Sequence, residues 1–256
     1  MTPLPKEFLS RPLAHRGYHN GGIGVPENSC AAFERAVVQG YGIELDVQLS
    51  ADGEAMVFHD FGLERLTSES GLVRERGRSE LGNIKLRDSA ETIPALDEVL
   101  ELIAGRKPVL VEIKRPVRTK TDDGNSLERA VARASNPYEG PVAVMSFCPN
   151  AVARFADAAP DIPRGLTTCP FRPQDWPDLP DDVLVGLRNV VDFDRLGATF
   201  ISHQVADLSR PRVSELKVGG SPVLCWTVRS IEQEMEARRV AHNITFEGYA
   251  ARSAVP

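Results

Sequence analysis

The sequence of 256 residues has no long apolar run, only four cysteines and no excess of positive charge. No run approaches the roughly 18 apolar residues that a membrane-spanning helix needs, so we expect no stable membrane insertion. Lysine and arginine number 30 against 36 aspartates and glutamates, a net charge of −6. This balance argues against nucleic acid as a partner, because phosphate backbones are bound by basic surfaces.

The four cysteines lie far apart in the chain and show neither the paired spacing of a metal site nor a disulfide framework. We therefore expect reduced thiols. The first residues contain Lys6 and Arg11 but no apolar stretch long enough for the core of a signal peptide. These features predict a soluble, cytoplasmic protein.

Short apolar runs typical of strands alternate with longer helical patterns along the whole chain. The eight predicted strands are Leu13–Arg16, Gly42–Val47, Val109–Lys114, Val142–Phe147, Arg164–Thr167, Thr199–Ser202, Val223–Thr227 and Asn243–Phe246. The seven predicted helices are Ser29–Gln39, Leu96–Ala104, Leu127–Ala134, Asn150–Ala158, Asp181–Val190, Arg210–Leu216 and Ile231–Val240. This alternation predicts an α/β fold, a TIM (β/α)8 barrel formed by residues 1–256 as a single domain.

A long segment separates the second strand from the third, and residues 50–90 are predicted to form a hairpin and a small insertion subdomain. Ser50–His59 fits the hairpin, with Asp52-Gly53 at the turn and Ala55–Phe58 as the returning strand. The polar segment Phe61–Ser89 is expected over the barrel mouth. The proline-rich loop Cys169–Pro180 is expected on the same rim.

Three acidic residues lie on the predicted second and third strands. Glu44 and Asp46 are two residues apart, so both point to one face, and their apolar neighbours require that face to be the barrel interior. Glu112 repeats the arrangement on the neighbouring strand. Three convergent carboxylates without cysteine predict a site for one divalent cation, Mg²⁺ or Ca²⁺. The alternative is a buried ion-pair network with Lys114 and Arg16.

Two histidines are expected at the same mouth. His15 ends the first strand, and His59 ends the hairpin after the second. Two imidazoles beside a cation suit general acid–base catalysis. Arg16 offers the planar pair of donors that phosphate oxygens favour, and can also pair with Glu44 or Glu27. The remaining histidines are predicted to be structural: His19, His203 and His242.

Trp226 at the end of the seventh strand is expected either to line the substrate site or to pack in the barrel. Glu27 lies before the first helix, where it can serve as part of a capping signal or brace His15 or Arg16. The glycines between Gly17 and Gly24 match no phosphate-binding motif.

Several of these segments form an ordered set of motifs. They are HRG at His15–Gly17, PENS at Pro26–Ser29, G-x-x-x-E-L-D-V at Gly40–Val47, DG at Asp52-Gly53, HD at His59-Asp60, LERLT at Leu63–Thr67 and EIK at Glu112–Lys114. Taken together, they resemble the glycerophosphodiester phosphodiesterase family.

The resemblance implies a barrel that cleaves a small-molecule glycerophosphodiester to sn-glycerol 3-phosphate and an alcohol with a divalent cation. It places the metal on Glu44, Asp46 and Glu112, acid–base catalysis on His15 and His59, phosphate binding on Arg16, and Lys114 and Trp226 along the site. It also suggests attack by the substrate's own glycerol hydroxyl through a cyclic phosphate. Choline, ethanolamine, glycerol and inositol diesters all fit, and the oligomeric state is left open.

The main departure from the family is the segment Phe246-Glu247-Gly248-Tyr249, where Thr-Asp-x-Pro is common. We expect it to alter the loop on the alcohol side and to leave the metal and histidine residues untouched. Ser29 and Ser50 replace threonines that are usual in the family.

Two other functions are compatible with a barrel of this kind. A phospholipase of the sphingomyelinase D type also pairs two histidines with a metal, and secretion or a lipid-facing rim would favour it. A non-catalytic barrel that binds phosphodiesters or a protein would have lost a histidine or a carboxylate, yet all five residues are present.

Overall fold

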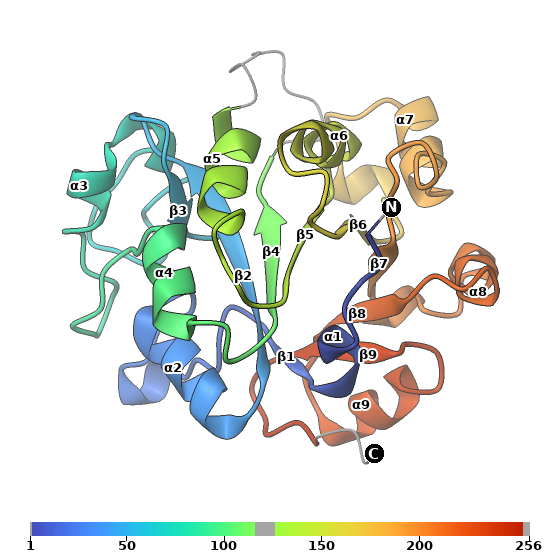
Figure 1. The fold of residues 1–256 in the computed structure, drawn as a ribbon, viewed down its shortest axis with the longest axis horizontal. Helices are drawn as coiled ribbons and strands as arrows, with labels where there is room; N and C mark the ends of the chain where they lie inside the picture. Colours follow the sequence, from blue (N-terminus) through green and yellow to red (C-terminus); the bar gives the residue numbers. More distant parts are fainter. Residues whose placement is uncertain (1, 116–125, 253–256) are drawn as a thin grey trace.

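The computed structural model describes residues 2–115 and 126–252, which form a closed barrel of eight parallel strands (Figure 1). The strands are β1 (Leu13–Ala14), β2 (Gly42–Leu49), β4 (Val109–Ile113), β5 (Val142–Ser146), β6 (Arg164–Thr168), β7 (Phe200–Gln204), β8 (Val223–Val228) and β9 (Asn243–Phe246). Pairing of β1 with both β2 and β9 closes the barrel. The predicted (β/α)8 barrel and all eight predicted strands are therefore confirmed.

Seven helices cover the outside of the barrel, each within a few residues of its predicted position (Figure 1). They are α2 (Cys30–Gln39), α4 (Leu96–Ile103), α5 (Ser126–Ser135), α6 (Pro149–Ala158), α7 (Asp181–Arg188), α8 (Pro211–Val218) and α9 (Ile231–Ala237). Ser29 caps α2, because its Oγ accepts a hydrogen bond of 3.2 Å from the Ala32 N–H.

A hairpin follows β2, as predicted. Strand β3 (Ala55–Val57) pairs antiparallel with β2, and Val47 lies opposite Val57. Gly53 in the turn has φ 85°, a left-handed conformation that glycine adopts without steric cost. The segment after the hairpin includes the short helix α3 (Arg78–Leu81).

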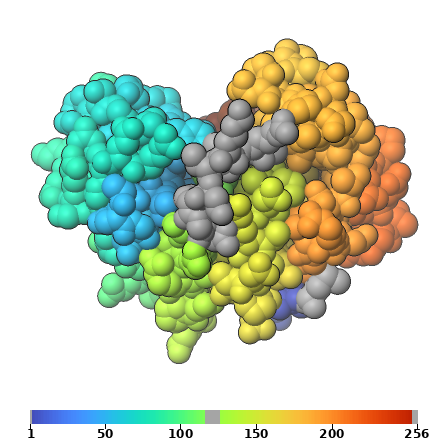
Figure 2. All heavy atoms as spheres, turned by 90° about the horizontal axis from the view of Figure 1, so that it is seen from above, coloured from blue at the N-terminus to red at the C-terminus, as the bar shows by residue number. Residues whose placement is uncertain are grey.

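The insertion has an apolar cluster of its own. Its buried members are Met56, Phe58, Leu63, Val73, Leu81, Ile84, Leu86, Ile93 and Ala95. Viewed onto the carboxyl ends of the strands, the molecule is notched between the insertion, in teal, and the segment that carries α7, in gold (Figure 2). The division into one barrel domain and a subdomain at residues 50–90 stays a prediction.

The strand alternation fixes which side chains enter the barrel. Ile43, Leu45 and Val47 lie in the apolar cluster shared with the outer helices. Glu44 and Asp46 consequently face inward, and Asp46 lies opposite Glu112 in the register of β2 and β4. The predicted inward orientation of the carboxylates is confirmed.

A short helix that the sequence pattern did not indicate, α1 (Glu7–Ser10), packs at the opposite end of the barrel. Its Phe8 is fully buried, and the Asn243 side chain donates hydrogen bonds to the carbonyls of Phe8 and Arg11. Phe8 belongs to the interior cluster, whose other buried members are Leu4, Leu13, Leu110, Ala143, Met145, Phe200 and Leu224. In the described part of the chain, no helix has the length and apolar character needed to cross a bilayer.

We predict that Phe8→Ala lowers the free energy of unfolding by about 3–5 kcal/mol, because it opens a cavity beneath the barrel. Urea denaturation followed by circular dichroism measures the change. Val218→Ala is the control, since Val218 is 89% exposed and its truncation should cost less than about 0.5 kcal/mol. Equal losses for the two variants would show that α1 does not close the core.

Candidate active site

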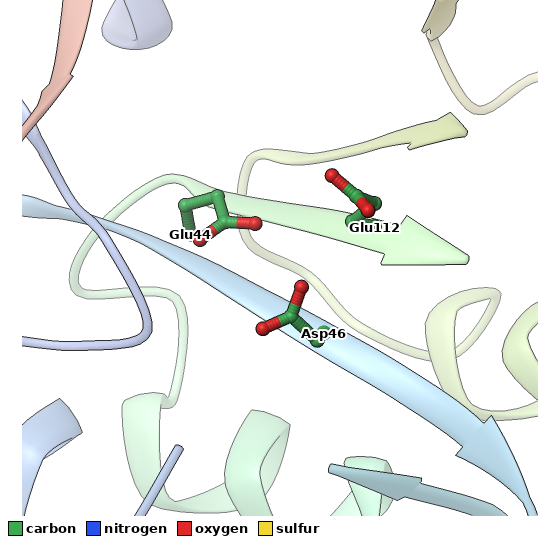
Figure 3. Close-up of side chains that lie close together, drawn as sticks. All are labelled: Glu44, Asp46 and Glu112. Carbon is green, nitrogen blue, oxygen red and sulfur yellow. The ribbon is translucent and has the colours of Figure 1, made fainter. Parts of the chain in front are cut away.

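Three buried carboxylates gather inside the barrel on the neighbouring strands β2 and β4 (Figure 3). One ligand oxygen from each of Glu44, Asp46 and Glu112 lies within 4.8 Å of the others. Burial, together with the neighbouring carboxylates, raises the pKa of Glu44 well above its usual range. Burial also raises the pKa of Glu112. Both directions are those expected of carboxylates that are buried close to one another.

Two cationic side chains partly offset the cluster. Lys114 Nζ lies 2.9 Å from Asp46 Oδ1 and hydrogen-bonds Glu112, while Arg16 Nε lies 3.3 Å from Asp46 Oδ2. The charges of Lys114, His59 and Arg16 outweigh burial and hold the pKa of Asp46 far below its usual range. The ion pairs considered from the sequence therefore exist, and they concentrate on Asp46.

Glu44 receives much less compensation. Within the described residues its side chain accepts one hydrogen bond, from the Arg16 backbone N–H at 3.1 Å. The Arg16 guanidinium is shared with Glu27, whose Oε1 lies 2.7 Å from Arg16 Nη1. Three carboxylates, one ammonium and one shared guanidinium leave a residual negative charge among oxygen donors. The cluster is therefore a candidate site for a hard divalent cation.

Asn28 is a site residue to which the sequence analysis gave no role beyond its place in the PENS motif. Its backbone is left-handed, with φ 55°, and its Nδ2 donates to Asp46 Oδ2 at 2.9 Å. Its N–H also donates to the Arg16 carbonyl at 2.9 Å. Asparagine is among the few residues that tolerate this conformation, so the position combines a turn with a contact to the acidic cluster.

The turn after β1 presents His15 and Arg16 to the site. Gly17 has φ 80°, and a Cβ at this position would lie 2.8 Å from the Cβ of Ala32. Only glycine lets the chain pass this close to α2. The glycine of the HRG motif is therefore explained by packing, while the two residues before it face the mouth.

His15 is held by a carboxylate from the other end of the chain. Its Nδ1 lies 2.5 Å from Glu247 Oε2, and its Nε2 lies 3.9 Å from Glu44 Oε2. Arg229 Nε also donates to Glu247 Oε1 at 2.8 Å. The expectation that the atypical segment at 246–249 leaves the histidines untouched is therefore wrong, because the loop after β9 folds back over the end of β1.

His59 has the same kind of partner. Its Nδ1 lies 2.6 Å from Asp60 Oδ1, and its backbone carbonyl accepts a hydrogen bond from Gln48 Nε2 at 2.9 Å. Burial lowers the pKa of both His15 and His59. A positive charge on either ring would lower the pKa of Asp46, as expected of histidines close to the acidic cluster.

On the other side of the mouth, Trp226 belongs to an aromatic group. Its ring centroid lies 5.5 Å from that of Phe147, and Phe147 lies 5.7 Å from Trp176. Trp226 Nε1 donates to the Ser202 carbonyl at 3.0 Å, which fixes the indole. All three aromatic residues are partly exposed, so Trp226 packs against Phe147 and also leaves part of its ring accessible at the barrel mouth. The proline-rich loop contributes Trp176 to the same rim.

His203, by contrast, is buried and its ring nitrogens have partners. Nδ1 lies 2.8 Å from Thr168 Oγ1, and Nε2 lies 3.2 Å from both the carbonyl and the carboxylate of Asp207. This geometry agrees with the structural role predicted for His203.

Comparison with known proteins decides the family. The model of the glycerophosphoryl diester phosphodiesterase family matches residues 15–242. The chain belongs to this family. The resemblance drawn from the motifs is confirmed, and the chain is assigned to a family of phosphodiester-cleaving enzymes.

Individual relatives support the same assignment. The chain is 34% identical over 169 residues to a glycerophosphodiester phosphodiesterase of Bacillus altitudinis, covering 62% of this chain and 67% of that protein. It is 36% identical over 163 residues to one of Caldanaerobacter subterraneus, covering 60% of this chain and 65% of that protein, just under two thirds of its length. A solved phosphodiesterase of Oleispira antarctica, in complex with the product sn-glycerol-3-phosphate, shares the fold. The TM-score is 0.76 at 24% identity, over 94% of this chain and 93% of that one.

We predict that Glu44→Gln stabilises the metal-free protein, and more so at higher pH. The folded-state pKa of Glu44 lies above its ordinary value of 4.5, so the folded protein binds more protons than the unfolded chain as pH rises beyond that value. The free energy of unfolding of the wild type therefore falls with rising pH through this range. The glutamine side chain does not titrate, so Glu44→Gln should avoid this fall. We expect a gain in the free energy of unfolding of roughly 1–3 kcal/mol, the usual cost of a poorly compensated buried group.

Thermal unfolding in EDTA between pH 5 and pH 8 measures this effect. Glu101→Gln, on the exposed face of α4, is the matched control and should follow the wild type. A Glu44→Gln protein that is less stable than the wild type in EDTA at pH 8 contradicts the electrostatic explanation.

Proposed function

We propose that this protein hydrolyses glycerophosphodiesters to sn-glycerol 3-phosphate and an alcohol, using one divalent cation and two histidines. The observation that carries the proposal is the pairing of His15 and His59 with carboxylates at Nδ1 beside a buried acidic cluster. Membership of the family supports it, and so does the product bound to the Oleispira antarctica relative.

Glu44, Asp46 and Glu112 would hold the cation, because their buried oxygens suit Mg²⁺ or Ca²⁺ and their negative charge is only partly offset. When bound, such an ion stabilises the negative charge that builds on phosphoryl oxygens. The register of β2 and β4 places Asp46 opposite Glu112, so the strands preorganise the site.

Arg16 and Lys114 would bind the phosphate. Each side chain is 16% exposed and already lies against the acidic cluster, so each can contact a phosphoryl oxygen there with little movement. The Arg16 guanidinium offers planar, directional donors, while the Lys114 ammonium acts as a compact charge.

The histidines would move the protons. With each Nδ1 facing a carboxylate, the ring is fixed in the tautomer that protonates Nδ1, and Nε2 is left for the reacting oxygens. One ring deprotonates the attacking oxygen, and the other protonates the leaving oxygen. Burial lowers both pKa values and so favours the neutral ring that a base requires, while the hydrogen bonds to Glu247 and Asp60 act in the opposite direction and favour the protonated ring that an acid requires.

The alcohol would lie against the aromatic group of Phe147, Trp176 and Trp226. This surface stands at the carboxyl ends of β5 and β8, where barrel enzymes place substrate contacts. Attack by the glycerol hydroxyl of the substrate would expel the alcohol and form a cyclic phosphate, and water would then open this ring to give sn-glycerol 3-phosphate.

Phosphorus NMR of the purified protein with glycerophosphocholine and with glycerophosphoethanolamine tests the proposal. We expect a glycerol 3-phosphate signal that EDTA abolishes and that added Mg²⁺ or Ca²⁺ restores. A cyclic phosphate as the final product would instead support the lyase-type reaction of the sphingomyelinase D class. Tight metal binding without turnover of any diester would support a non-catalytic barrel.

His15→Ala and His59→Ala should each lower kcat by about 10²–10⁴-fold, the usual contribution of a positioned acid or base. Metal affinity, measured by calorimetry, should stay within a few-fold of wild type, since neither ring is in the carboxylate set. His242→Ala serves as control, because His242 is exposed and directly precedes β9, at the end of the strand away from the mouth. A kcat that survives both substitutions contradicts the assignment.

Glu247→Gln should lower kcat by about 10–100-fold while KM and metal affinity change little, because the amide no longer fixes the His15 tautomer. Steady-state kinetics gives the separation between kcat and KM. Glu54→Gln, a half-exposed glutamate in the hairpin, provides the control. If Glu247→Gln retains full kcat, the contact between Glu247 and His15 has no catalytic consequence.

A further inference from the structure

Arg65 lies in the insertion, in the segment Leu63–Thr67, outside the metal, histidine and phosphate-binding residues proposed above. Its guanidinium spans two carboxylates. Nε and Nη2 donate to Asp60 Oδ2 and Oδ1 at 2.5 and 3.1 Å, while Nη1 and Nη2 donate to Glu27 Oε2 and Oε1 at 3.0 and 2.8 Å. Both contacts of the guanidinium are therefore bidentate.

Each of these carboxylates also holds a proposed functional side chain. Asp60 Oδ1 lies 2.6 Å from His59 Nδ1, and Glu27 Oε1 accepts a bond of 2.7 Å from Arg16 Nη1. One guanidinium thus connects the partner of a proposed acid–base ring with the partner of a proposed phosphate-binding arginine.

The backbone that carries Arg65 forms a hydrogen-bonded turn between two buried side chains. Leu63 and Thr67 on either side are fully buried, and Thr67 closes the turn through its N–H and its Oγ1, both of which donate to the Leu63 carbonyl at 3.1 and 2.9 Å. Arg65 itself is 45% exposed. The turn, rather than burial of the side chain, therefore positions the guanidinium between Asp60 and Glu27, an arrangement that we call the Arg65 clamp.

Electrostatics supports the clamp. Burial raises the pKa of Glu27, but the hydrogen bonds and charges of Arg65 and Arg16 outweigh it and leave the pKa below the ordinary value. Exposed ion pairs add little to stability, so attachment of the insertion to the barrel is a weak reason for this geometry. Arg78 already ties the insertion to α4 through Asp97 and Glu98, at 2.8 and 3.0 Å.

We propose that Arg65 is a positioning residue that holds His59 and Arg16 in register with each other through Asp60 and Glu27. The inference rests on the proposed function, because it assigns the insertion a part in the same reaction. Its distinguishing feature is that loss of one surface arginine disturbs both an acid–base ring and a phosphate contact.

Arg65→Gln is the first test. We expect kcat to fall about 10–100-fold, as for other residues that orient a reacting group, and KM to rise severalfold because Arg65 no longer holds Glu27, the partner of Arg16. Low-millimolar guanidinium should restore part of kcat to Arg65→Gly. In a double-mutant cycle with Asp60→Asn, the fold-decrease in kcat of the double variant should be smaller than the product of the two single fold-decreases. The reason is that both substitutions release the same His59 ring.

Arg78→Gln is the matched control, since Arg78 is also a half-exposed arginine in the insertion that spans two carboxylates. It should change thermal stability about as much as Arg65→Gln and leave kcat and KM unchanged. Equal effects of the two variants on kcat, or no effect of Arg65→Gln, would overturn the proposal.

Imidazole ¹⁵N NMR keeps this test separate from that of the proposed function. The His59 resonances, assigned through His59→Ala, should show one fixed tautomer protonated at Nδ1 in the wild type and in Arg78→Gln. They should show a mixture of tautomers in Arg65→Gln. If the wild type turns over no diester, the proposed function fails, and the His59 ¹⁵N spectrum alone then tests the positioning role of Arg65. A mixture of tautomers confined to Arg65→Gln supports that role. An unchanged tautomer in Arg65→Gln refutes it.

Discussion

The structure depends on three carboxylates that are buried together at the mouth of a parallel barrel. Placing Glu44, Asp46 and Glu112 within 4.8 Å of one another is costly in a medium that excludes water. The chain offsets the cost around Asp46, with an ammonium, a guanidinium and an amide, and leaves Glu44 with little more than a backbone N–H. This uneven compensation makes the cluster suited to a cation and accounts for the opposite pKa shifts of neighbouring carboxyl groups.

A second set of carboxylates, outside the first, sets the direction of the histidines. Strand β1 ends at Ala14, so the barrel places His15 at the mouth but does not by itself fix the angle of the ring. Glu247 does so from the loop after the last strand, 232 positions further along the chain. Asp60 does the same for His59, and Arg65 in turn holds Asp60. The insertion and the loop after β9, far apart in the sequence, therefore orient the two histidine rings of one site.

Much of this arrangement follows from local patterns. The alternation of apolar and acidic residues along β2 and β4 is enough to predict, from the sequence alone, that Glu44, Asp46 and Glu112 face the barrel interior. The four-residue helix α1 has no such signal, because four residues do not complete a detectable helical period. The partners of the histidines are also beyond local patterns, since they depend on where loops fold. Glu247 could be recognised as a departure from the family, but its contact with His15 required the closed barrel.

The central claim is that the acidic cluster binds the cation on which hydrolysis depends. Calorimetric titration of the metal-free protein with Mg²⁺ and with Ca²⁺, with turnover of glycerophosphocholine measured on the same sample at each step, tests it most directly. The account predicts one ion per chain, no binding to Asp46→Asn at matched concentrations, and turnover that rises in proportion to occupancy. Full turnover in the metal-free protein, or turnover that does not follow occupancy, would contradict it.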